Sequence, residues 1–365
     1  MPAGTRLKGD TLKLETYILG GTGAIGSYLV NILSENHIDT TVTTRRFHDN
    51  ISYVTYVCGN AHDNDFLNQL CAQHWDSIID FMSYKTEEFK KRVDILLNAT
   101  SQYVYISSAR VYANEEHPIK ESSPRLLDVT KDKTFLNTDE YALTKARQEN
   151  ILISHPNKNY TIIRPYISYG NYRLQLGTLE KEEWLYRALH NRTIIFTDEI
   201  AKKLTTLTSG YDVAIGIYKL LGKSNAYGET FHITNKRVLK WEDVISIYDN
   251  CLYQLTGKRI KIKNVPLNTY FQIRRPELKY QVLYDRLYNR DFITTKEILI
   301  QDVEHFIDPS VGLKKCLEHF FQNPRFLSIN WQYEAIKDKL TSEFTPLYEI
   351  KGIKNKFRYL RYRFL

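Results

Sequence analysis

The sequence predicts an α/β protein built on a doubly wound parallel sheet, with a smaller α/β domain after it. Two observations lead to this fold class. Between residues 14 and 168, short apolar runs alternate with stretches of helical spacing. After Arg164 and Pro165 this rhythm loosens, although strand and helix candidates continue. We therefore expect a sheet domain over residues 14–168, a second domain over 169–335 that partly returns to the sheet, and a tail over 336–365.

The elements of the first domain follow in order from local patterns. Residues 17–19 are a short apolar run, and residues 25–33 place apolar side chains at helical spacing. Residues 40–44 consist of threonine and valine, which favour a strand. The remaining candidates are strands at 53–58, 77–81, 103–107 and 160–163, and helices at 66–73, 87–98 and 140–154. This alternation predicts parallel strands joined by right-handed crossovers, with helices covering both faces.

The second half contains fewer clear elements. Helical spacing recurs at 179–189, 211–221 and 241–255, and residues 230–233 are a strand candidate. No internal repeat or low-complexity segment interrupts this half. These elements predict a smaller domain that packs beside the sheet and contributes to it.

Charge and cysteine content limit the class of protein. Lysine and arginine number 50 against 42 acidic residues, which gives a formal net charge of +8. No apolar run approaches the ~20 residues of a membrane-spanning helix, and residues 1–16 lack the apolar stretch of a secretory signal. The four cysteines show no CxxC spacing, so neither a metal site nor a disulfide framework is expected. These absences favour a cytoplasmic protein.

The last fifteen residues differ from the rest of the chain. They carry six basic residues and no acidic one, and without them 44 basic residues stand against 42 acidic ones. Ile353, Phe357, Leu360 and Phe364 recur at steps of four, three and four, as in an amphipathic helix. A basic helix of this kind suits peripheral contact with an anionic membrane at its inner face. Docking on the domain or on a dimer partner is the alternative, and we expect a homodimer.

A glycine-rich turn joins the first strand to the first helix. Residues 20–26 read GGTGAIG, a GxxGxxG pattern. The first glycine suits a tight turn, the second lets a pyrophosphate approach the backbone, and the third lets the helix pack closely on the strand. The N-terminus of that helix offers free N–H groups to a phosphate. The turn therefore predicts a dinucleotide site. The expected contacts are Gly20, Thr22, Gly23, Ala24, Ile25 and Gly26.

The end of the second strand indicates which dinucleotide is bound. An acidic residue there would bind the ribose hydroxyls of NAD, but residues 42–46 read VTTRR and no carboxylate follows until Asp49. Hydroxyl and guanidinium groups suit a 2′-phosphate instead. NADP is therefore the expected cofactor and NAD the alternative. Thr44 and Arg45 are the first candidates for the phosphate contact and Arg46 the second, unless this is merely a solvated basic loop.

Two further motifs carry catalytic chemistry. Tyr141 and Lys145 form a YxxxK element on the helix predicted at 140–154, where a spacing of four places both side chains on one face. Ser107 and Ser108 leave the carboxyl end of a strand, the edge at which doubly wound sheets bind ligands. A nearby ammonium favours the phenolate, so the tyrosine can act as acid or base.

The order of these motifs resembles a known family. The glycine turn, the serine strand, the YxxxK helix, and Arg164 with Pro165 after the next strand follow one another along the chain. Because of this order, the chain resembles the extended short-chain dehydrogenases/reductases. Among these it is most similar to the NAD-dependent epimerase/dehydratase family of nucleotide-sugar enzymes. The similarity covers roughly residues 15–320 and is strongest before residue 170. It implies a Rossmann-type sheet domain and a C-terminal substrate-binding domain.

The resemblance implies roles for single residues. Ser108 matches the catalytic Ser/Thr and Tyr141 the general acid/base, whereas Lys145 would hold the nicotinamide ribose and tune Tyr141. Asn60 stands where the family usually carries an aspartate beside adenine. The cofactor contacts implied along the dinucleotide are Asn60, Ala61, Phe81, Met82, Ser83, Ser107, Pro165, Tyr166 and Ile167.

The chain also departs from the family pattern. Ala109 and Arg110 stand where 4,6-dehydratases usually carry Asp-Glu, so dehydration is not expected. Arg110 would face a phosphate or a sugar carboxylate, or merely form a salt bridge at the surface. Arg286 and Arg290 are four residues apart, which would place them on one helical face suited to a diphosphate or merely to solvent. The expected substrate contacts are Ser83, Tyr84, Arg110, Asn171, Arg173, Arg286 and Arg290, with residues 172–175 well placed.

These features predict a nucleotide-sugar ketoreductase or epimerase that uses NADP, with Tyr141 as the acid/base. The rivals are a catalytically silent NADP-sensing regulator and an RNA-binding member of the same superfamily. The complete set of Ser108, Tyr141 and Lys145 argues against both rivals, since neither needs it. No nucleic-acid partner is expected, because the chain lacks an RNP-like aromatic motif.

Overall fold

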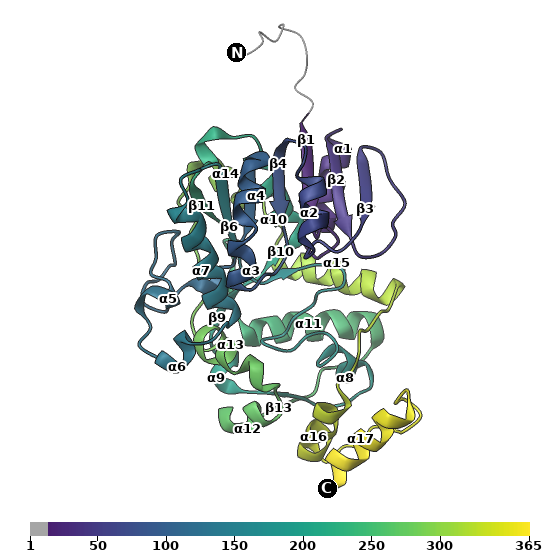
Figure 1. Cartoon of the computed structure of the whole chain (residues 1–365). Coiled ribbons are helices and arrows are strands. Elements are labelled where there is room, and N and C mark those ends of the chain that lie inside the picture. The colour runs from purple at the N-terminus through teal and green to yellow at the C-terminus, as the bar shows by residue number, and fades with distance from the viewer. Residues whose placement is uncertain (1–13) are drawn as a thin grey trace, which may run out of the picture.

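The computed structural model describes residues 14–365 and confirms the Rossmann-type parallel sheet (Figure 1). Within these residues the central sheet has seven strands in the order β11-β6-β5-β4-β1-β2-β3. Their bounds are β1 Glu15–Leu19, β2 Asp39–Thr44, β3 Val54–Cys58, β4 Trp75–Asp80, β5 Thr100–Ile106, β6 Tyr160–Pro165 and β11 Glu229–Ile233. Residues 1–13, most of the segment expected to carry no secretory signal, lie outside the described part.

All strands of this sheet run parallel, so their carboxyl ends share one edge. Tyr17 of β1 pairs with Thr41 of β2 on one side and with Ile78 of β4 on the other. The chain builds outward from β1 to β3 in one direction and from β4 to β11 in the other. This reversal beside β1 is the point at which doubly wound sheets bind their ligands.

Helices cover both faces of the sheet (Figure 1). On one face, α1 (Gly26–Glu35), α10 (Gly210–Leu220) and α14 (Glu297–Glu304) pack around Ile18 of β1. On the other face lie α2 (Asn64–Leu70), α3 (Thr86–Lys90), α4 (Val93–Asn98) and α7 (Tyr141–Ser154), packed around Tyr17. Successive residues of β1 thus enter opposite cores, because strand side chains alternate between faces.

One predicted helix is interrupted. The amphipathic pattern at 87–98 forms two helices, α3 and α4, that are separated at Lys91 and Arg92. The Arg92 side chain is fully buried, and its Nη1 donates to His62 O at 2.9 Å and to Asn64 Oδ1 at 3.1 Å. A continuous solvent-facing helix would not require this arginine to be buried. The side chain instead holds the loop that follows β3.

A second core lies below the sheet. Its centre contains Trp184, which stacks on Tyr248 with ring centroids 4.3 Å apart, and Trp241. The pattern at 179–189 forms a helix only over α8 (Leu185–Leu189), because turns occupy the residues before it. The other elements here are α9 Asp198–Ala201, α11 Trp241–Thr256, α12 Leu267–Gln272, α13 Lys279–Gln281, α15 Pro309–Gln322, β7 Ser168–Tyr169, β8 Ile194–Phe196, β9 Leu204–Thr206, β10 Thr208–Ser209, β12 Val238–Lys240 and β13 Ile262–Asn264. Two short helices, α5 Leu126–Val129 and α6 Lys133–Leu136, lie before α7.

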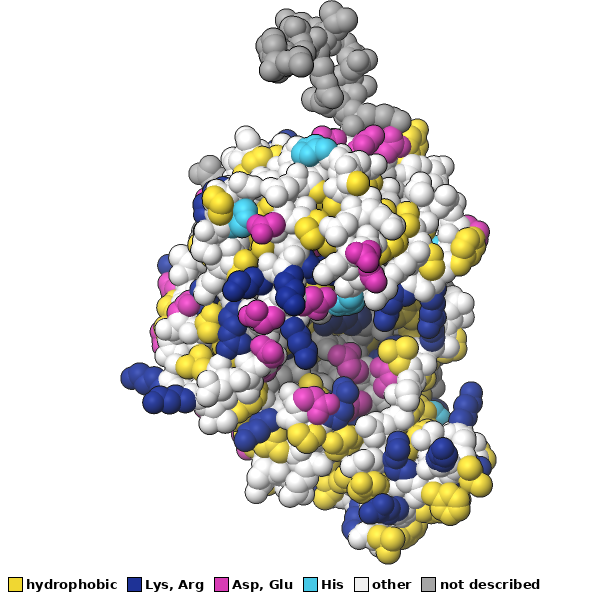
Figure 2. All heavy atoms as spheres, viewed as in Figure 1, with side chains coloured by type: hydrophobic (Ala, Val, Ile, Leu, Met, Phe, Trp, Pro, Cys, Tyr) yellow, Lys and Arg dark blue, Asp and Glu magenta, His cyan; other side chains and the backbone are white. Residues whose placement is uncertain are grey.

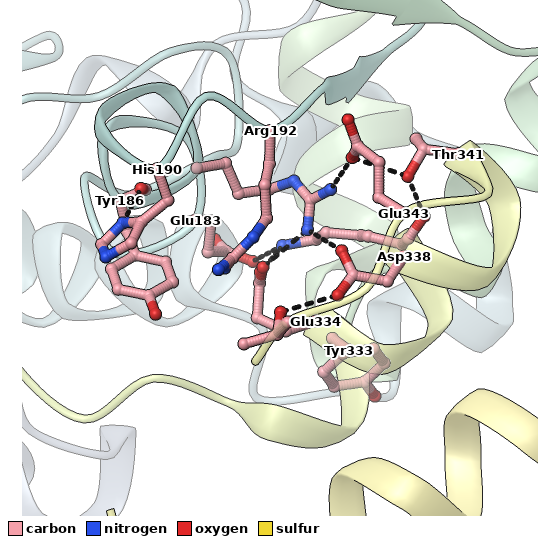
Figure 3. Close-up of polar contacts among 12 residues, drawn as sticks. Glu183, Tyr186, His190, Arg192, Tyr333, Glu334, Asp338, Thr341 and Glu343 are labelled. Carbon is pink, nitrogen blue, oxygen red and sulfur yellow. Dashed lines mark hydrogen bonds and ion pairs between the residues drawn. The ribbon is translucent and has the colours of Figure 1, made fainter. Parts of the chain in front are cut away.

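The C-terminal segment forms a helical hairpin of α16 (Trp331–Thr341) and α17 (Ile353–Phe364). Figure 3 shows carboxylates of this hairpin turned toward α8 and the loop after it. The fully buried Arg187 of α8 contacts Glu334 and Asp338 through Nη1 at 2.8 and 2.9 Å, and Glu343 through Nη2 at 2.8 Å. The hairpin is therefore held to the second core by buried ion pairs.

No helix in the described part of the chain has both the length and the apolar character needed to cross a membrane.

Candidate functional site

The glycine turn follows β1 at the carboxyl edge of the sheet. Gly20 has a φ of +74°, and its N–H donates to Thr43 Oγ1 at 3.1 Å. A Cβ on Gly26 would lie 2.7 Å from the carbonyl oxygen of Gly21, so α1 could not pack this closely on the turn. A Cβ on Gly23 would meet no heavy atom within 4 Å. The first and third glycines are thus required by the fold, whereas the middle one leaves open space.

That open space belongs to two adjoining cavities. One has a volume of 470 Å³ and the other 350 Å³, and both are lined by Gly20, Gly23, Phe81 and Ser83. The first N–H groups of α1 lack helical partners and attract anions. The two cavities together form one continuous space along the carboxyl ends of the central strands. The start of α1 lies in the middle of this space.

Two of the three predicted catalytic residues, Ser108 and Tyr141, line the larger cavity. Ser108 follows β5, and its Oγ accepts a hydrogen bond from Arg110 N at 3.2 Å. Tyr141 begins α7 and is 40% exposed, so its phenol is open to the cavity that Ser108 also lines. Lys145 lies one helical turn later and is buried. Its Nζ donates to Ile106 O at 2.8 Å and lies 5.9 Å from the centroid of the Tyr141 ring.

Arg110 also lies close to the tyrosine ring. Its guanidinium carbon lies 5.1 Å from the Tyr141 ring centroid, and Nη2 contacts Glu140 at 2.5 Å. Glu140 also caps α7 by accepting from Ala142 N at 2.6 Å. Burial opposes the charge of Arg110, but Glu140 and Asp285 outweigh it and raise the pKa of the guanidinium. Arg110 therefore forms a salt bridge, as one of its two expected roles required, but in the interior rather than at the surface.

A buried ion pair fixes the strand ends beneath the site. Glu149 of α7 accepts from Arg164 Nε at 2.8 Å and from Arg164 Nη2 at 2.6 Å. The Ser107 hydroxyl donates to the same carboxylate at 2.5 Å. The ends of β5 and β6 are thereby tied to the helix that carries Tyr141, so the predicted catalytic residues have a rigid base.

The comparisons with known proteins agree with this geometry. The model of the NAD dependent epimerase/dehydratase family matches residues 16–210, more than half of the chain. The chain belongs to this family. No curated protein sequence matches it significantly.

Solved structures that include an epimerase share the fold. WbmH from Bordetella bronchiseptica, in complex with NAD+, is 15% identical with a TM-score of 0.63, and the match covers 86% of this chain and 100% of WbmH. A UDP-glucuronic acid 4-epimerase from Bacillus cereus, in complex with NAD, is 13% identical with a TM-score of 0.63 and the same coverages. MoeE5, in complex with UDP-glucuronic acid and NAD, is 15% identical with a TM-score of 0.62, covering 84% of this chain and 99% of MoeE5.

The turn and the cavities of this epimerase/dehydratase family member fit a dinucleotide. The space beside Gly23 suits a pyrophosphate that lies against the backbone. The smaller cavity suits the adenosine half, and its lining includes Thr44, Arg45 and Asn60. Among the described residues that line this cavity, none is Asp or Glu. The site therefore lacks the carboxylate that usually selects NAD.

Most of the predicted site residues line one of these two cavities. They are Gly20, Thr22, Gly23, Ala24, Ile25, Gly26, Thr44, Arg45, Asn60, Ala61, Phe81, Met82, Ser83, Ser107, Ser108, Arg110, Tyr141, Pro165, Ile167, Arg173 and Arg286. Six others do not: Arg46, Tyr84, Lys145, Tyr166, Asn171 and Arg290. Lys145 lies directly behind Tyr141, as a supporting residue would, whereas Arg46 is exposed outside the cavity.

Three of these positions correct the sequence interpretation. Tyr84 is buried under the sheet edge, where its hydroxyl donates to Asp80 Oδ1 at 3.3 Å, so it cannot reach a substrate. Tyr166 is buried against Phe292, with ring centroids 5.1 Å apart. Asn171 lines a separate neighbouring cavity and accepts from the Tyr28 hydroxyl at 3.4 Å.

Arg290 is the fourth correction. A π-helical turn, Val282–Arg286, ends before it, so Arg286 and Arg290 do not share a helical face. Arg290 is fully buried, with Nε at 2.9 Å from Asp285 Oδ1 and Nη2 at 3.0 Å from Tyr112 O. These bonds leave the side chain no access to a diphosphate. Arg286 does line the larger cavity, although its guanidinium also contacts Asp285.

The cavity includes polar residues that the sequence interpretation left out of the site. Glu180 and Gln281 line it, as does Gln175 at the end of the segment 172–175. Gln175 is buried, its Nε2 donates to Glu180, and its Oε1 has no hydrogen-bond partner in the protein. Glu180 directly precedes the turn at residues 181–184, and no sequence signal identified it. A free buried acceptor at a cavity wall is a position that a ligand hydroxyl can satisfy.

Proposed function

We propose that this protein is an NADP-dependent enzyme that reduces or epimerises a nucleotide-linked sugar. The observation that supports this best is that Ser108 and Tyr141 line the same cavity as Gly23 and the start of α1. A dinucleotide on the glycine turn would thus end beside an acid/base pair. An NADP-sensing regulator would not need an exposed phenol with both Lys145 and Arg110 close to its ring.

Each residue of the proposed active site has one role in the transfer of a hydride and a proton. The nicotinamide, when bound, supplies or accepts the hydride at a substrate carbon. Tyr141 donates a proton from its hydroxyl to the oxygen on that carbon during reduction and takes it back during oxidation. Ser108 orients the same oxygen, because its hydroxyl hydrogen is free to donate while its lone pair accepts from Arg110 N. Lys145 and Arg110 attract the negative charge that forms on the phenol oxygen.

The larger cavity favours a neutral sugar. Glu180 lines it and has no ion-pair partner among the described residues, so it would repel a sugar carboxylate. Arg110 and Arg286, two cations that line the cavity, are already paired with Glu140 and Asp285. Gln175 and Glu180 are suited to sugar hydroxyls, and the exposed Arg173 is suited to a phosphate of the nucleotide.

A panel of nucleotide sugars incubated with NADP or NADPH tests this function. Mass spectrometry follows the sugar, and the absorbance of the reduced nicotinamide follows the cofactor. A ketoreductase converts a keto-sugar with loss of that absorbance, whereas an epimerase converts its substrate without net loss. We expect UDP-glucose to bind tighter than UDP-glucuronic acid. NADP binding without binding or conversion of any nucleotide sugar would contradict the proposal and favour the sensing regulator.

NADP is proposed because of the loop after β2. Thr44 Oγ1 donates to Arg46 O at 2.9 Å and accepts from Arg46 N at 3.2 Å, which closes a tight turn. This turn places Arg45 at the smaller cavity and leaves Arg46 outside it. Among the described residues, no carboxylate pairs with Arg45. Its guanidinium is therefore free for a 2′-phosphate.

Replacing Arg45 with alanine is expected to weaken NADP binding about ten- to hundredfold, because one charge-assisted contact is lost. NAD binding should change little, since NAD carries no 2′-phosphate. Titration calorimetry with both cofactors measures this difference. Arg46→Ala is the matched control and should weaken NADP binding much less. A wild-type protein that prefers NAD, or an Arg45→Ala variant that keeps its preference, would contradict the assignment.

Three further expectations stay proposals: a homodimer, a cytoplasmic location, and contact of the C-terminal segment with a membrane. Light scattering at several concentrations tests the first, and cell fractionation tests the second. The third depends on which face α17 exposes.

A further inference from the structure

Helix α17 docks on the protein with its tyrosine face. Tyr359 is fully buried, and its hydroxyl donates to Asp338 Oδ2 at 2.6 Å and accepts from Thr345 N at 2.7 Å. Of the apolar stripe identified in the sequence, only Leu360 packs in part against this contact. Ile353 is 70% exposed, Phe357 68% and Phe364 61%. Burying such side chains would be favourable, so their exposure on one helix face requires an explanation.

Cations lie beside the exposed stripe. Lys354, Arg358 and Arg361 are exposed, and at 3.6 residues per turn they fall next to the stripe rather than on the docked side. Figure 2 shows hydrophobic and basic side chains side by side at this end of the molecule. We call Ile353, Lys354, Phe357, Arg358, Arg361 and Phe364 the outer face of α17. Leu365 and Tyr348, which are both strongly exposed, extend the apolar area at its margin.

We propose that the outer face of α17 binds the surface of a membrane that contains anionic lipids. Aromatic and aliphatic side chains flanked by lysine and arginine are the pattern of helices that lie in the plane of a membrane. Phe357 and Phe364 would enter the boundary between headgroups and acyl chains, while the three cations contact lipid phosphates. Residues 351–365 contain no acidic residue that would oppose this contact.

Other occupants fit the outer face less well. A second copy of the chain related by a two-fold axis would bring the three cations of one outer face against the same three of the other, and these repel each other. A nucleic acid would match the cations but would leave Ile353 and Phe364 without an apolar environment. An anionic membrane satisfies both the charge and the apolar surface.

The hairpin holds the outer face ready before binding. Arg187 joins α8 to α16, and Tyr359 joins α17 to α16. Arg363 Nε also donates to Glu343 O at 3.0 Å, which fixes the last turn of α17. A helix that is already folded loses little conformational freedom when it binds. This distinguishes the outer face from a disordered basic tail, which would have to fold on the membrane.

Cosedimentation of the full-length protein with vesicles tests the proposal. We expect binding to vesicles of mixed phosphatidylglycerol and phosphatidylcholine, and at least a tenfold loss on pure phosphatidylcholine, since each basic residue strengthens binding about fivefold. Added salt should also weaken binding. Phe357→Ser with Phe364→Ser, and separately Lys354→Glu with Arg358→Glu, should each lower the affinity at least tenfold, because insertion and attraction act together.

The controls separate this site from unspecific adsorption. Leu327 is exposed in the same part of the molecule but lies outside the outer face, and Leu327→Ser should leave binding unchanged. Equal unfolding temperatures would show that the variants fold. Equal binding to both kinds of vesicle, or undiminished binding of the phenylalanine variant, would overturn the proposal. Sedimentation that shows a dimer, converted to monomer in the phenylalanine variant, would also overturn the proposal. So would a protein that does not bind vesicles but binds RNA, if the charge variant abolishes the RNA binding.

Discussion

Replacing Tyr141 with phenylalanine should lower turnover of the nucleotide sugar about 10²- to 10⁴-fold, the usual contribution of a positioned proton donor. The phenyl ring keeps its packing beneath Arg110, so the loss reports on the hydroxyl alone. Steady-state kinetics with NADP(H) measure this loss as kcat. Binding of cofactor and sugar should change little, because the hydroxyl acts mainly when the proton moves.

A matched tyrosine is available as the control for this variant. Tyr253 of α11 is 49% exposed and has the Arg259 guanidinium 4.0 Å from its ring centroid, yet it lies outside the cavity. Tyr253→Phe should leave kcat within about twofold of the wild type. If Tyr141→Phe retains most of its turnover while the control behaves as expected, another group supplies the proton and the proposed mechanism fails.

Replacing Arg187 with alanine should lower the free energy of unfolding by about 3–5 kcal/mol, because three carboxylates lose their buried partner. Glu334, Asp338 and Glu343 surround this guanidinium. Denaturant unfolding followed by circular dichroism measures the change. The exposed pair of Lys240 and Glu242 supplies the control, and Lys240→Ala should change the same free energy by less than about 1 kcal/mol.

The pH dependence of this loss has a definite sign. Burial would raise the pKa of Asp338, but Arg187 and the hydrogen bonds from Tyr359 and Thr345 outweigh it and keep the pKa below its ordinary value. A carboxyl group of this kind contributes stability above the unfolded pKa of about 4, and the contribution fades as the pH falls through the folded value. Wild type and Arg187→Ala should therefore converge in acid. A difference that stays constant down to acidic pH would contradict the ion-pair explanation.

The sheet domain was predictable because its signals are local. The apolar runs of β1 and β5 and the glycine turn each depend on residues close together in the chain. The placement of the proposed catalytic residues was predictable as well, since Tyr141 and Lys145 share one helix and Ser108 follows the end of one strand. The family match over residues 16–210 falls on this part of the chain.

The substrate-binding residues were less predictable, because burial determines which of the candidate side chains reach the cavity. Arg286 and Arg290 look equivalent in sequence, but a π-helical turn and Asp285 leave one at the cavity and bury the other. Tyr84 likewise follows β4 at the expected edge, yet its hydroxyl turns back to Asp80. Helical spacing identified the stripe of α17 but could not show that Tyr359, outside the stripe, forms the docked face. Such choices depend on long-range partners that periodicity does not reveal.

The ion pairs of Asp285 limit how far the two sides of the cavity can move apart. This single buried carboxylate contacts Arg110 from the loop after β5 as well as Arg286 and Arg290 from the second core. A hinge that opened the cleft would separate these groups and leave charge buried without a partner, which is costly. The ion pairs of Asp285 thus hold the two sides of the cavity together. Substrate should enter by movement of side chains and loops at the rim, while the width of the cleft stays the same before and after binding.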